Sequence, residues 1–443
     1  MSAIAKVLAE RGETVSGSDQ AVSVYTEALE ALGVPIAYGH RAENIAGAEL
    51  VLVSSAVAAT NPEVVAALQA GVPVMRREGF LAELTAPYEV IATAGTHGKT
   101  TTTGLIAWIL SEAGLDPSFI VGGVLLDFGS NAHAGSGKSF VIEADEYDRA
   151  FLGLHPEIAV VTSVEHDHPD CFPTPEDFRA AFVQFASQVW RTLIVCADDP
   201  AAAALPSKAQ RLSYGLAPGA DWRAEEIRPN GVGGCDFLVL ERGRVLGLAR
   251  TRLPGEHNVR NTLAALAVAQ ECGVPFATSR QALTGFRGAS RRSEVIGEAG
   301  GVVVVDDYAH HPTEIRATLS GLRQRYPGRR LWAVFQPHTF SRLRALLDDF
   351  AASFADADHV RITDIFAARE LPDGATTSRA LAEKVRHPDC RYSGTLEESA
   401  RELIERVEPN SVVVTLSAGD GNWIGRQLLE ARSQREGTRD AEG

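Results

Sequence analysis

The chain has 443 residues, with 42 basic and 57 acidic side chains and a formal net charge of −15. This balance excludes a general nucleic-acid binder or a protein that docks on an anionic membrane, because both need basic patches. The composition is that of a soluble globular protein, and five scattered cysteines without a CxxC spacing indicate reduced thiols and a cytoplasmic location.

The first 88 residues alternate helical and strand patterns, which predicts a small parallel sheet. Residues 1–11 predict an amphipathic helix and residues 13–16 a short strand, with Asp19 near its end. This order is typical of the second half of a nucleotide-binding βαβ unit. Further along, residues 49–57 (ELVLVSSAV) predict a buried strand that ends in hydroxyl groups.

Two more series of strands and helices follow. One begins at residue 88 with YEVIATAGTHGKTTTTG, and the other begins near residue 301 with GVVVVDDYAHHP. Their strands are apolar on both faces and alternate with helices, as in parallel sheets covered on both sides. We therefore predict three α/β domains with boundaries near residues 88 and 294, followed by a polar, disordered tail over 431–443.

The stretch ATAGTHGKTTTTG resembles a phosphate-binding loop between a strand and a helix. Gly98, Lys99 and Thr100 fit the Walker A pattern, but Thr93 replaces its first glycine and Gly95 follows two residues later. Backbone N–H groups and the helix N-terminus would attract an anion there. Lys99 would bridge the β- and γ-phosphates of ATP, and the Thr100 hydroxyl would bind Mg²⁺. The alternative is a glycine-rich turn with a surface lysine.

Acidic residues cluster after two later strands. VIEADEYD contains Glu143, Asp145, Glu146 and Asp148. SVEHDHPDCF contains Glu165, His166, Asp167, His168 and Asp170. Carboxylates so close together need a cation, which the Mg²⁺ of a nucleotide would supply. Two histidines in the second stretch can bind zinc, but no third ligand has a supporting spacing, and both stretches can also be solvated loops.

Six motifs, in this order, resemble the Mur ligase family: GTHGKTTTT, EADEYDRAFL, EHNVRNTLAALAVA, FRGASRR, DDYAHHPTEIRATL and FQPHTFSR. The resemblance extends from residue 1 to about 425. It implies a Rossmann-like domain for a UDP-sugar (1–88), a central P-loop ATPase-type domain (89–293) and a C-terminal Rossmann-like domain for an amino acid (294–430). It also implies ATP-dependent formation of an amide bond in peptidoglycan precursor synthesis.

The resemblance also implies site residues. Contacts to ATP are expected from Gly95, Thr96, His97, Gly98, Lys99, Thr100, Thr101, His257, Asn258, Asn261, Arg291 and Asp307. The expected ligands of Mg²⁺ are Thr100, Glu143 and His166. The candidate contacts to the UDP-sugar are Asp19, His40, Ser54 and Ser55. The expected catalytic residues are Lys99, His166, Arg292, His310 and Arg342.

Some of these roles have alternatives. Either Arg291 or Arg292 resembles the arginine that reaches the transferred phosphate. Asn258 can also cap its helix. Tyr308 and His311 can equally be packing residues at the end of a strand.

One departure from the pattern points to a branch of the family. Several relatives carry a carbamoylated lysine after the histidine motif, where this chain has Phe182. Its absence fits the branch that joins L-alanine to UDP-N-acetylmuramate through an acyl phosphate, although a second Mg²⁺ then needs other support. The alternatives are a recycling ligase that adds L-Ala-γ-D-Glu-diaminopimelate to the same UDP-sugar, a P-loop regulatory NTPase, and an inactive UDP-sugar-binding protein.

The start of the chain also departs from the family. In the family, a strand and a glycine-rich turn with the pattern G-x-G-G-x-G come before the pattern M-S-x-[ILA]-A. This chain begins at the second pattern, so Met1 matches the methionine that follows the last glycine of the turn. We expect that roughly one strand and one diphosphate-binding turn are missing, and we favour a mis-assigned start codon over a true truncation. The 443-residue form should then bind the UDP-sugar poorly while its ATP site is intact.

Overall fold

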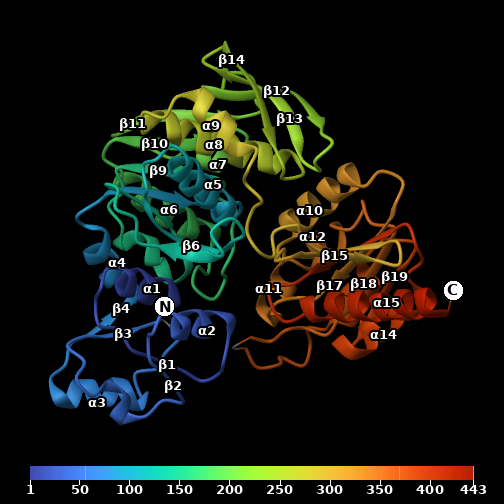
Figure 1. Cartoon of the computed structure of the whole chain (residues 1–443), viewed down its shortest axis with the longest axis horizontal. Coiled ribbons are helices and arrows are strands. Elements are labelled where there is room, and N and C mark those ends of the chain that lie inside the picture. Colours follow the sequence, from blue (N-terminus) through green and yellow to red (C-terminus); the bar gives the residue numbers. More distant parts are fainter. Residues whose placement is uncertain (55, 369, 443) are drawn as a thin grey trace.

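A computed structural model describes residues 1–54, 56–368 and 370–442, with the side chains of 437–442 excepted. Three α/β parts follow one another along the chain (Figure 1). The N-terminal part lies against the central part, and the C-terminal part lies beside the central part. In the residues described, no helix has the length and apolar character that crossing a membrane requires.

The N-terminal part holds two short parallel strand pairs. They are β1 (Gly17–Asp19) with β2 (Ile36–Tyr38), and β3 (Val51–Val53) with β4 (Val74–Arg76). Its helices are α1 (Ser2–Glu10), α2 (Val24–Ala31), the 3-10 helix η1 (Ala42–Ile45), α3 (Pro62–Ala70) and α4 (Arg77–Thr85). The strand predicted at 13–16 was wrong by a few residues, because pairing of Gly17 with Ile36 decides where β1 begins. Strand β3 is shorter than predicted and half-buried.

The central part is built on one ten-stranded sheet in the order β14-β13-β12-β11-β10-β9-β5-β8-β6-β7. Its strands are β5 (Glu89–Ala94), β6 (Ser118–Leu125), β7 (Ser130–His133), β8 (Ser139–Glu143), β9 (Ile158–Val161), β10 (Thr192–Cys196), β11 (Gln210–Gly215), β12 (Trp222–Pro229), β13 (Cys235–Glu241) and β14 (Arg244–Thr251). Neighbouring strands pair in parallel along the part of this order that runs from β12 through β11, β10, β9, β5 and β8 to β6. The carboxyl ends of these strands therefore share one edge of the sheet.

Helices cover both faces of this sheet. They are α5 (Lys99–Glu112), η2 (Tyr147–Gly153), α6 (Pro175–Ser187), α7 (Pro200–Ala203), α8 (Glu256–Glu271) and α9 (Phe276–Leu283). Helices α5, α8 and α9 share one core with residues such as Ile91 and Phe119. Helix α6 shares the other core with Phe140 and with Ile4 of α1, so the N-terminal helix packs on the central sheet.

The C-terminal part has a six-stranded sheet in the order β15-β16-β20-β17-β18-β19. Its strands are β15 (Glu294–Ala299), β16 (Val302–Asp307), β17 (Arg330–Phe335), β18 (His359–Thr363), β19 (Cys390–Gly394) and β20 (Ser411–Leu416). Its helices are α10 (Pro312–Arg325), α11 (Phe340–Ala345), α12 (Leu347–Ala351), α13 (Ser378–Lys384), α14 (Leu396–Arg406) and α15 (Asn422–Glu442). Only β15 pairs antiparallel, at the edge of the sheet beside β16.

The expected disordered tail is instead the end of helix α15, which continues to Glu442. Long polar side chains at the start of this segment contact the end of α14 and the turn between β15 and β16. The Arg432 guanidinium donates to the carbonyl of Val407, and the Glu436 carboxylate accepts a 2.7 Å hydrogen bond from the backbone N–H of Gly300. The polar composition suggested disorder because it gives no sign of these backbone partners.

Candidate active site

The loop between β5 and α5 requires glycine at two positions. Gly95 and Gly98 adopt φ angles of +131° and +81°. A Cβ atom on Gly95 would lie 2.0 Å from the Thr162 hydroxyl oxygen, and one on Gly98 would lie 2.6 Å from Asn261 Oδ1. The loop is therefore a tight turn at a helix N-terminus, as an anion-binding loop should be, and Asn261 of α8 contacts it.

The substitution Gly98→Ala should weaken nucleotide binding. The left-handed backbone costs alanine about 1–2 kcal/mol, and the new methyl group displaces Asn261. We expect the KM for ATP to rise about tenfold, which corresponds to about 1.4 kcal/mol. Gly114→Ala is the matched control, because its φ is +77° and its Cβ would meet nothing within 4 Å. Equal KM values for the two variants would contradict a binding role of the loop.

Lys99 is the buried cation of this loop. Its Nζ donates to the carbonyl oxygens of Gly95 (2.6 Å) and Thr96 (3.3 Å) and lies 2.8 Å from Glu146 Oε1. Burial lowers the pKa of Lys99, but nearby carboxylates, above all Glu146, outweigh burial and raise the pKa above its usual value. Lys99 therefore stays charged at neutral pH. Through its contact with Glu146, it provides a cation for the acidic cluster.

Glu143 ends β8 beside this lysine. It accepts hydrogen bonds from the Thr100 hydroxyl (3.1 Å) and from the backbone N–H of Gly122 (2.6 Å). Burial raises the pKa of Glu143, and Lys99 opposes this effect. A Cβ on Gly122 would lie 2.8 Å from both carboxylate oxygens, so the carboxylate sits in a fitted recess. Oxygen donors of this kind fit Mg²⁺.

A cavity of about 380 Å³ lies between α1 and the central sheet. Its wall includes Glu143 and the ion pair of Arg77 with Asp145, whose closest atoms are 2.7 Å apart. Ile4 of α1 forms part of the opposite wall. The cavity therefore connects the N-terminal part with the carboxylate that we expect to hold Mg²⁺.

The structure separates the two histidines of SVEHDHPDCF. Nε2 of His166 donates to the carbonyl of Phe172 (2.8 Å), and its ring packs edge-on against Phe178. His168 instead places Nε2 3.6 Å from Glu146 Oε1, the carboxylate that pairs with Lys99. His166 therefore faces the backbone of Phe172 while His168, with a positive φ of 55°, faces the acidic cluster, and the metal-binding role of His166 stays a prediction.

The position expected for a modified lysine is part of the core. Phe182 is fully buried and packs against Phe151 with ring centroids 5.2 Å apart. It offers no ligand atom, so any support for a second metal ion must come from elsewhere in the site.

Three of the expected contacts to ATP, His257, Asn258 and Asn261, lie in the first turns of helix α8. Asn258 Nδ2 donates to the carbonyl of Pro254 (2.8 Å), and Asn261 Nδ2 donates to Asn258 Oδ1 (3.2 Å). Toward the backbone Asn258 acts as a donor, whereas a side chain that caps a helix N-terminus accepts from backbone N–H groups, and Gly255 occupies the N-cap of α8. Burial lowers the pKa of His257 to about 4, and Arg260 adds to this effect, so the imidazole is neutral at neutral pH.

The two arginines of FRGASRR have different surroundings. Arg291 is anchored in the C-terminal sheet, because its Nε lies 3.2 Å from Asp306 Oδ2 and its Nη2 donates to the carbonyl of Ser417 (2.7 Å). Arg292 lies 3.7 Å from Glu314 Oε1. Burial lowers the pKa of Arg292, but acidic groups including Glu314 raise it overall. Arg292 is therefore the better placed of the two to reach a phosphate.

Asp307 lies at the end of β16 with both oxygens engaged. One accepts from the backbone N–H of Ser293 (2.7 Å) and the other from that of Ala309 (2.8 Å). Burial raises the pKa of Asp307 to about 6, partly opposed by Arg292. In this arrangement Asp307 fixes the chain where it enters the C-terminal sheet, and its contact with ATP stays a prediction.

Arg342 joins the central and C-terminal parts. Its Nε and Nη2 lie 3.1 Å and 2.9 Å from Asp167 Oδ1, and its Nη1 lies 3.0 Å from His338 Nδ1. Burial raises the pKa of Asp167, but Arg342 outweighs it and holds the pKa well below the usual range. Arg342 was expected near the reacting groups, whereas its partnership with Asp167 was not predicted.

His310, one of the expected catalytic residues, lies beside Glu314, with Nδ1 3.3 Å from Oε2. Burial lowers its pKa to about 3, opposed by Glu314. Its Nδ1 donates to the carbonyl of Tyr308 (2.9 Å). A general base works best with a pKa near the working pH, so His310 would be a weak base, and its catalytic role stays a prediction.

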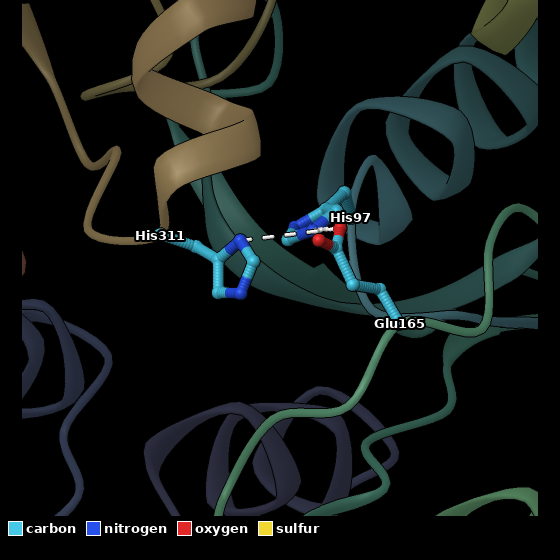
Figure 2. Close-up of side chains that lie close together, drawn as sticks. All are labelled: His97, Glu165 and His311. Carbon is cyan, nitrogen blue, oxygen red and sulfur yellow. Dashed lines mark hydrogen bonds and ion pairs between the residues drawn. The ribbon is translucent and has the colours of Figure 1, made fainter. Parts of the chain in front are cut away.

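His97 of the phosphate loop reaches toward the C-terminal part (Figure 2). Its Nε2 lies 2.8 Å from Glu165 Oε2 and its Nδ1 lies 3.4 Å from Glu314 Oε1. The His311 ring lies 4.7 Å away, centroid to centroid. Burial lowers the pKa of His97, but the two carboxylates raise it to about 9. Glu314 was missed in the sequence, where only its spacing of four from His310 could have indicated it.

The candidate contacts to the UDP-sugar lie in the N-terminal part. Asp19 is exposed and accepts from the backbone N–H of Gln20 (2.7 Å). His40 Nδ1 lies 3.3 Å from Glu63 Oε2, within a polar cluster of that part. Ser54 follows β3, and Ser55 lies outside the described residues. The roles of these residues stay predictions.

Comparisons with protein families agree along the chain. The model of the Mur ligase family catalytic domain matches residues 1–89, that of the Mur ligase middle domain residues 93–269, and that of the Mur ligase glutamate ligase domain residues 291–419. Among curated proteins, the UDP-N-acetylmuramate–L-alanine ligase of Roseiflexus sp. (strain RS-1) is 44% identical, with 98% of this chain and 97% of the relative covered. That of Geobacter sp. (strain M21) is also 44% identical, with 97% and 94% covered.

Solved structures show the same similarity. The UDP-N-acetylmuramate-alanine ligase MurC of Thermotoga maritima has a TM-score of 0.84 at 27% identity and covers 98% of this chain and 97% of its own. The murein peptide ligase of Psychrobacter arcticus has a TM-score of 0.72 at 28% identity, with 98% and 96% covered. The predicted three-domain α/β architecture is therefore confirmed.

Proposed function

Because the chain belongs to the Mur ligase family, we propose that it joins L-alanine to UDP-N-acetylmuramate with hydrolysis of ATP to ADP and phosphate. The reaction belongs to peptidoglycan precursor synthesis, and we assign it to the cytoplasm. The observation that carries this proposal is the glycine-built loop with buried Lys99 beside Glu143, on a chain 44% identical to such ligases over nearly its full length.

A carboxylate must be activated before an amine can displace one of its oxygens. In the proposed first step, a carboxylate oxygen of the UDP-sugar attacks the γ-phosphorus of ATP, and the bond to ADP breaks. The amine of L-alanine then attacks the acyl carbon, phosphate leaves, and the nitrogen loses a proton. Lys99 and Arg292 offset the charge as the two anions meet in the first step.

The metal site fits this chemistry. Glu143 and Thr100 would hold Mg²⁺ through oxygen atoms, and His168 is the better placed of the two nearby histidines to assist. The bound ion would neutralise phosphate charge and orient the transferred group. The reacting groups come from different domains, so closure around the substrates should complete the site and exclude water.

Release of ADP with each substrate omitted in turn tests the proposed function. We expect sustained release only when ATP, UDP-N-acetylmuramate and L-alanine are all present, because without L-alanine the reaction stops at the acyl phosphate after one turnover. Equal release without the UDP-sugar would instead indicate an NTPase, and preference for L-Ala-γ-D-Glu-diaminopimelate would indicate a recycling ligase. No release with any combination would contradict an enzyme.

The substitution Glu143→Gln should change the response to Mg²⁺. Losing a charged oxygen ligand should raise the half-saturating Mg²⁺ concentration about tenfold or more. A tenfold change requires a loss of only about 1.4 kcal/mol of binding free energy. Folding should be unaffected, because glutamine keeps the volume and an oxygen that can accept from the backbone N–H of Gly122. Glu89→Gln is the control, because Glu89 begins β5 and pairs with Lys138 at the surface. An unchanged Mg²⁺ dependence in Glu143→Gln would remove Glu143 from the metal site.

A further inference from the structure

Three side chains from separate segments converge beside the phosphate loop. His97 comes from that loop, Glu165 from the segment after β9, and His311 from the N-cap of α10 (Figure 2). One possible ligand atom from each residue lies within 4.8 Å of the others. Two imidazoles and one carboxylate form a ligand set typical of zinc sites that keep a fourth position for water.

Neighbouring groups already orient two of these ligands. His97 turns Nδ1 toward Glu314 Oε1 at 3.4 Å while Nε2 faces Glu165. A carboxylate behind the second nitrogen of a histidine is the arrangement that fixes metal-binding imidazoles. The Thr313 hydroxyl donates to Glu165 Oε1 (2.9 Å), which leaves Oε2 for the cluster.

His311 is a buried imidazole that makes few hydrogen bonds. Its side chain is 2% exposed, and its Nε2 has no hydrogen-bond partner in the described part of the chain. Its Nδ1 accepts one long bond from the backbone N–H of Thr313 (3.3 Å) and lies 4.0 Å from Glu165 Oε2. Nδ1 is thus the nitrogen of His311 that faces Glu165, and a single long hydrogen bond competes with a ligand for it.

We propose that His97, Glu165 and His311 bind a transition-metal ion of the zinc class. The ion takes His97 Nε2, Glu165 Oε2 and His311 Nδ1, and it displaces the proton shared by His97 and Glu165. The 4.0 Å gap between Glu165 and His311 must shorten to about 3.3 Å, the edge of a tetrahedron with bonds of about 2.0–2.1 Å.

This site differs from the magnesium position in its chemistry and its consequence. Two imidazole nitrogens favour zinc over Mg²⁺, which prefers oxygen ligands. Because His97 belongs to the central domain and His311 to the C-terminal domain, the ion joins the two domains. It would hold the phosphate loop against the start of α10.

Competition between the full-length chain and a chromophoric zinc chelator, without nucleotide, measures this binding. We expect one tight equivalent of Zn²⁺ per chain and at least about tenfold weaker binding in His311→Gln and in Glu165→Gln. Two controls should keep wild-type affinity: His155→Gln, an exposed histidine, and Cys171→Ser, a partly exposed thiol beside Asp170. No tight equivalent in the wild type, or equal losses in the controls, would overturn the proposal.

Two further readouts separate metal binding from damage to the fold. Zn²⁺ should raise the Tm of the wild type by mass action, whereas it should leave the Tm of His311→Gln unchanged. Mg²⁺ should not raise the Tm in place of Zn²⁺. Co²⁺ should give the strong visible bands of a tetrahedral site in the wild type alone. If His311→Gln does not fold, Thr313→Val replaces it. This change removes the bond that orients Glu165, together with an exposed bond from Arg316, and should weaken zinc binding. Unchanged zinc affinity in a folded ligand variant would refute the site.

Discussion

Lys99→Ala is expected to lower ADP-forming turnover by about 10³-fold or more while the chain stays folded. Lys99 Nζ is the charged donor inside the loop and lies 2.8 Å from Glu146 Oε1. Without it, the negative charge that develops on the transferred phosphate loses its nearest buried cation. The measurement is phosphate release with all three substrates present, together with the Tm of the variant.

Lys138→Ala is the matched control for this experiment. Lys138 forms an ion pair with Glu89, but its side chain is 75% exposed and lies outside the phosphate loop. We expect its turnover to be unchanged, because exposed ion pairs contribute little. Near-normal phosphate release by Lys99→Ala would refute the phosphate-loop assignment and the proposed function with it.

Arg342→Met is expected to destabilise the protein by about 3–5 kcal/mol. The arginine and Asp167 are both nearly buried, with side chains 5% and 7% exposed. Methionine preserves much of the volume but leaves the buried charge of Asp167 with a weaker partner, His168 Nε2 at 3.8 Å. Since Asp167 follows β9 and Arg342 belongs to α11, the loss should also loosen the contact between the two domains. Chemical denaturation measures the change in the free energy of unfolding.

Arg344→Met serves as the comparison, because Arg344 lies on the same helix with a side chain 63% exposed and pairs with Asp373. Its expected cost is at most about 1 kcal/mol. Combining Arg342→Met with Asp167→Asn should recover part of the lost stability, because the uncompensated charge is gone. Equal costs for Arg342→Met and Arg344→Met would show that the buried pair does not join the domains.

The phosphate loop could be predicted from the sequence because its determinants are local. Gly95 and Gly98 provide backbone conformations that other residues resist, and Lys99 follows at the first turn of a helix. Glu143 could be predicted for a related reason, because the carboxyl ends of neighbouring parallel strands share one edge of a sheet. Strand β8 pairs with β5, so Glu143 arrives beside the loop.

The choice between similar neighbours could not be made from the sequence. His166 and His168 are two residues apart, yet one contacts the carbonyl of Phe172 and the other faces Glu146. Arg291 and Arg292 are adjacent, yet only the second faces Glu314. In each case a positive φ, at His168 and at Arg291, redirects the chain, and a residue pattern does not show such a turn.

The sequence by itself determined the order of the three α/β domains, the phosphate loop and the carboxylate beside it. Each depends on hydrophobic periodicity or on the backbone freedom of glycine over a few residues. Only the tertiary structure decided the pairing of Asp167 with Arg342, which are 175 residues apart, and the cluster of His97, Glu165 and His311. Such contacts exist only when two domains pack, because their energy comes from burying charged groups that the unfolded chain leaves in water.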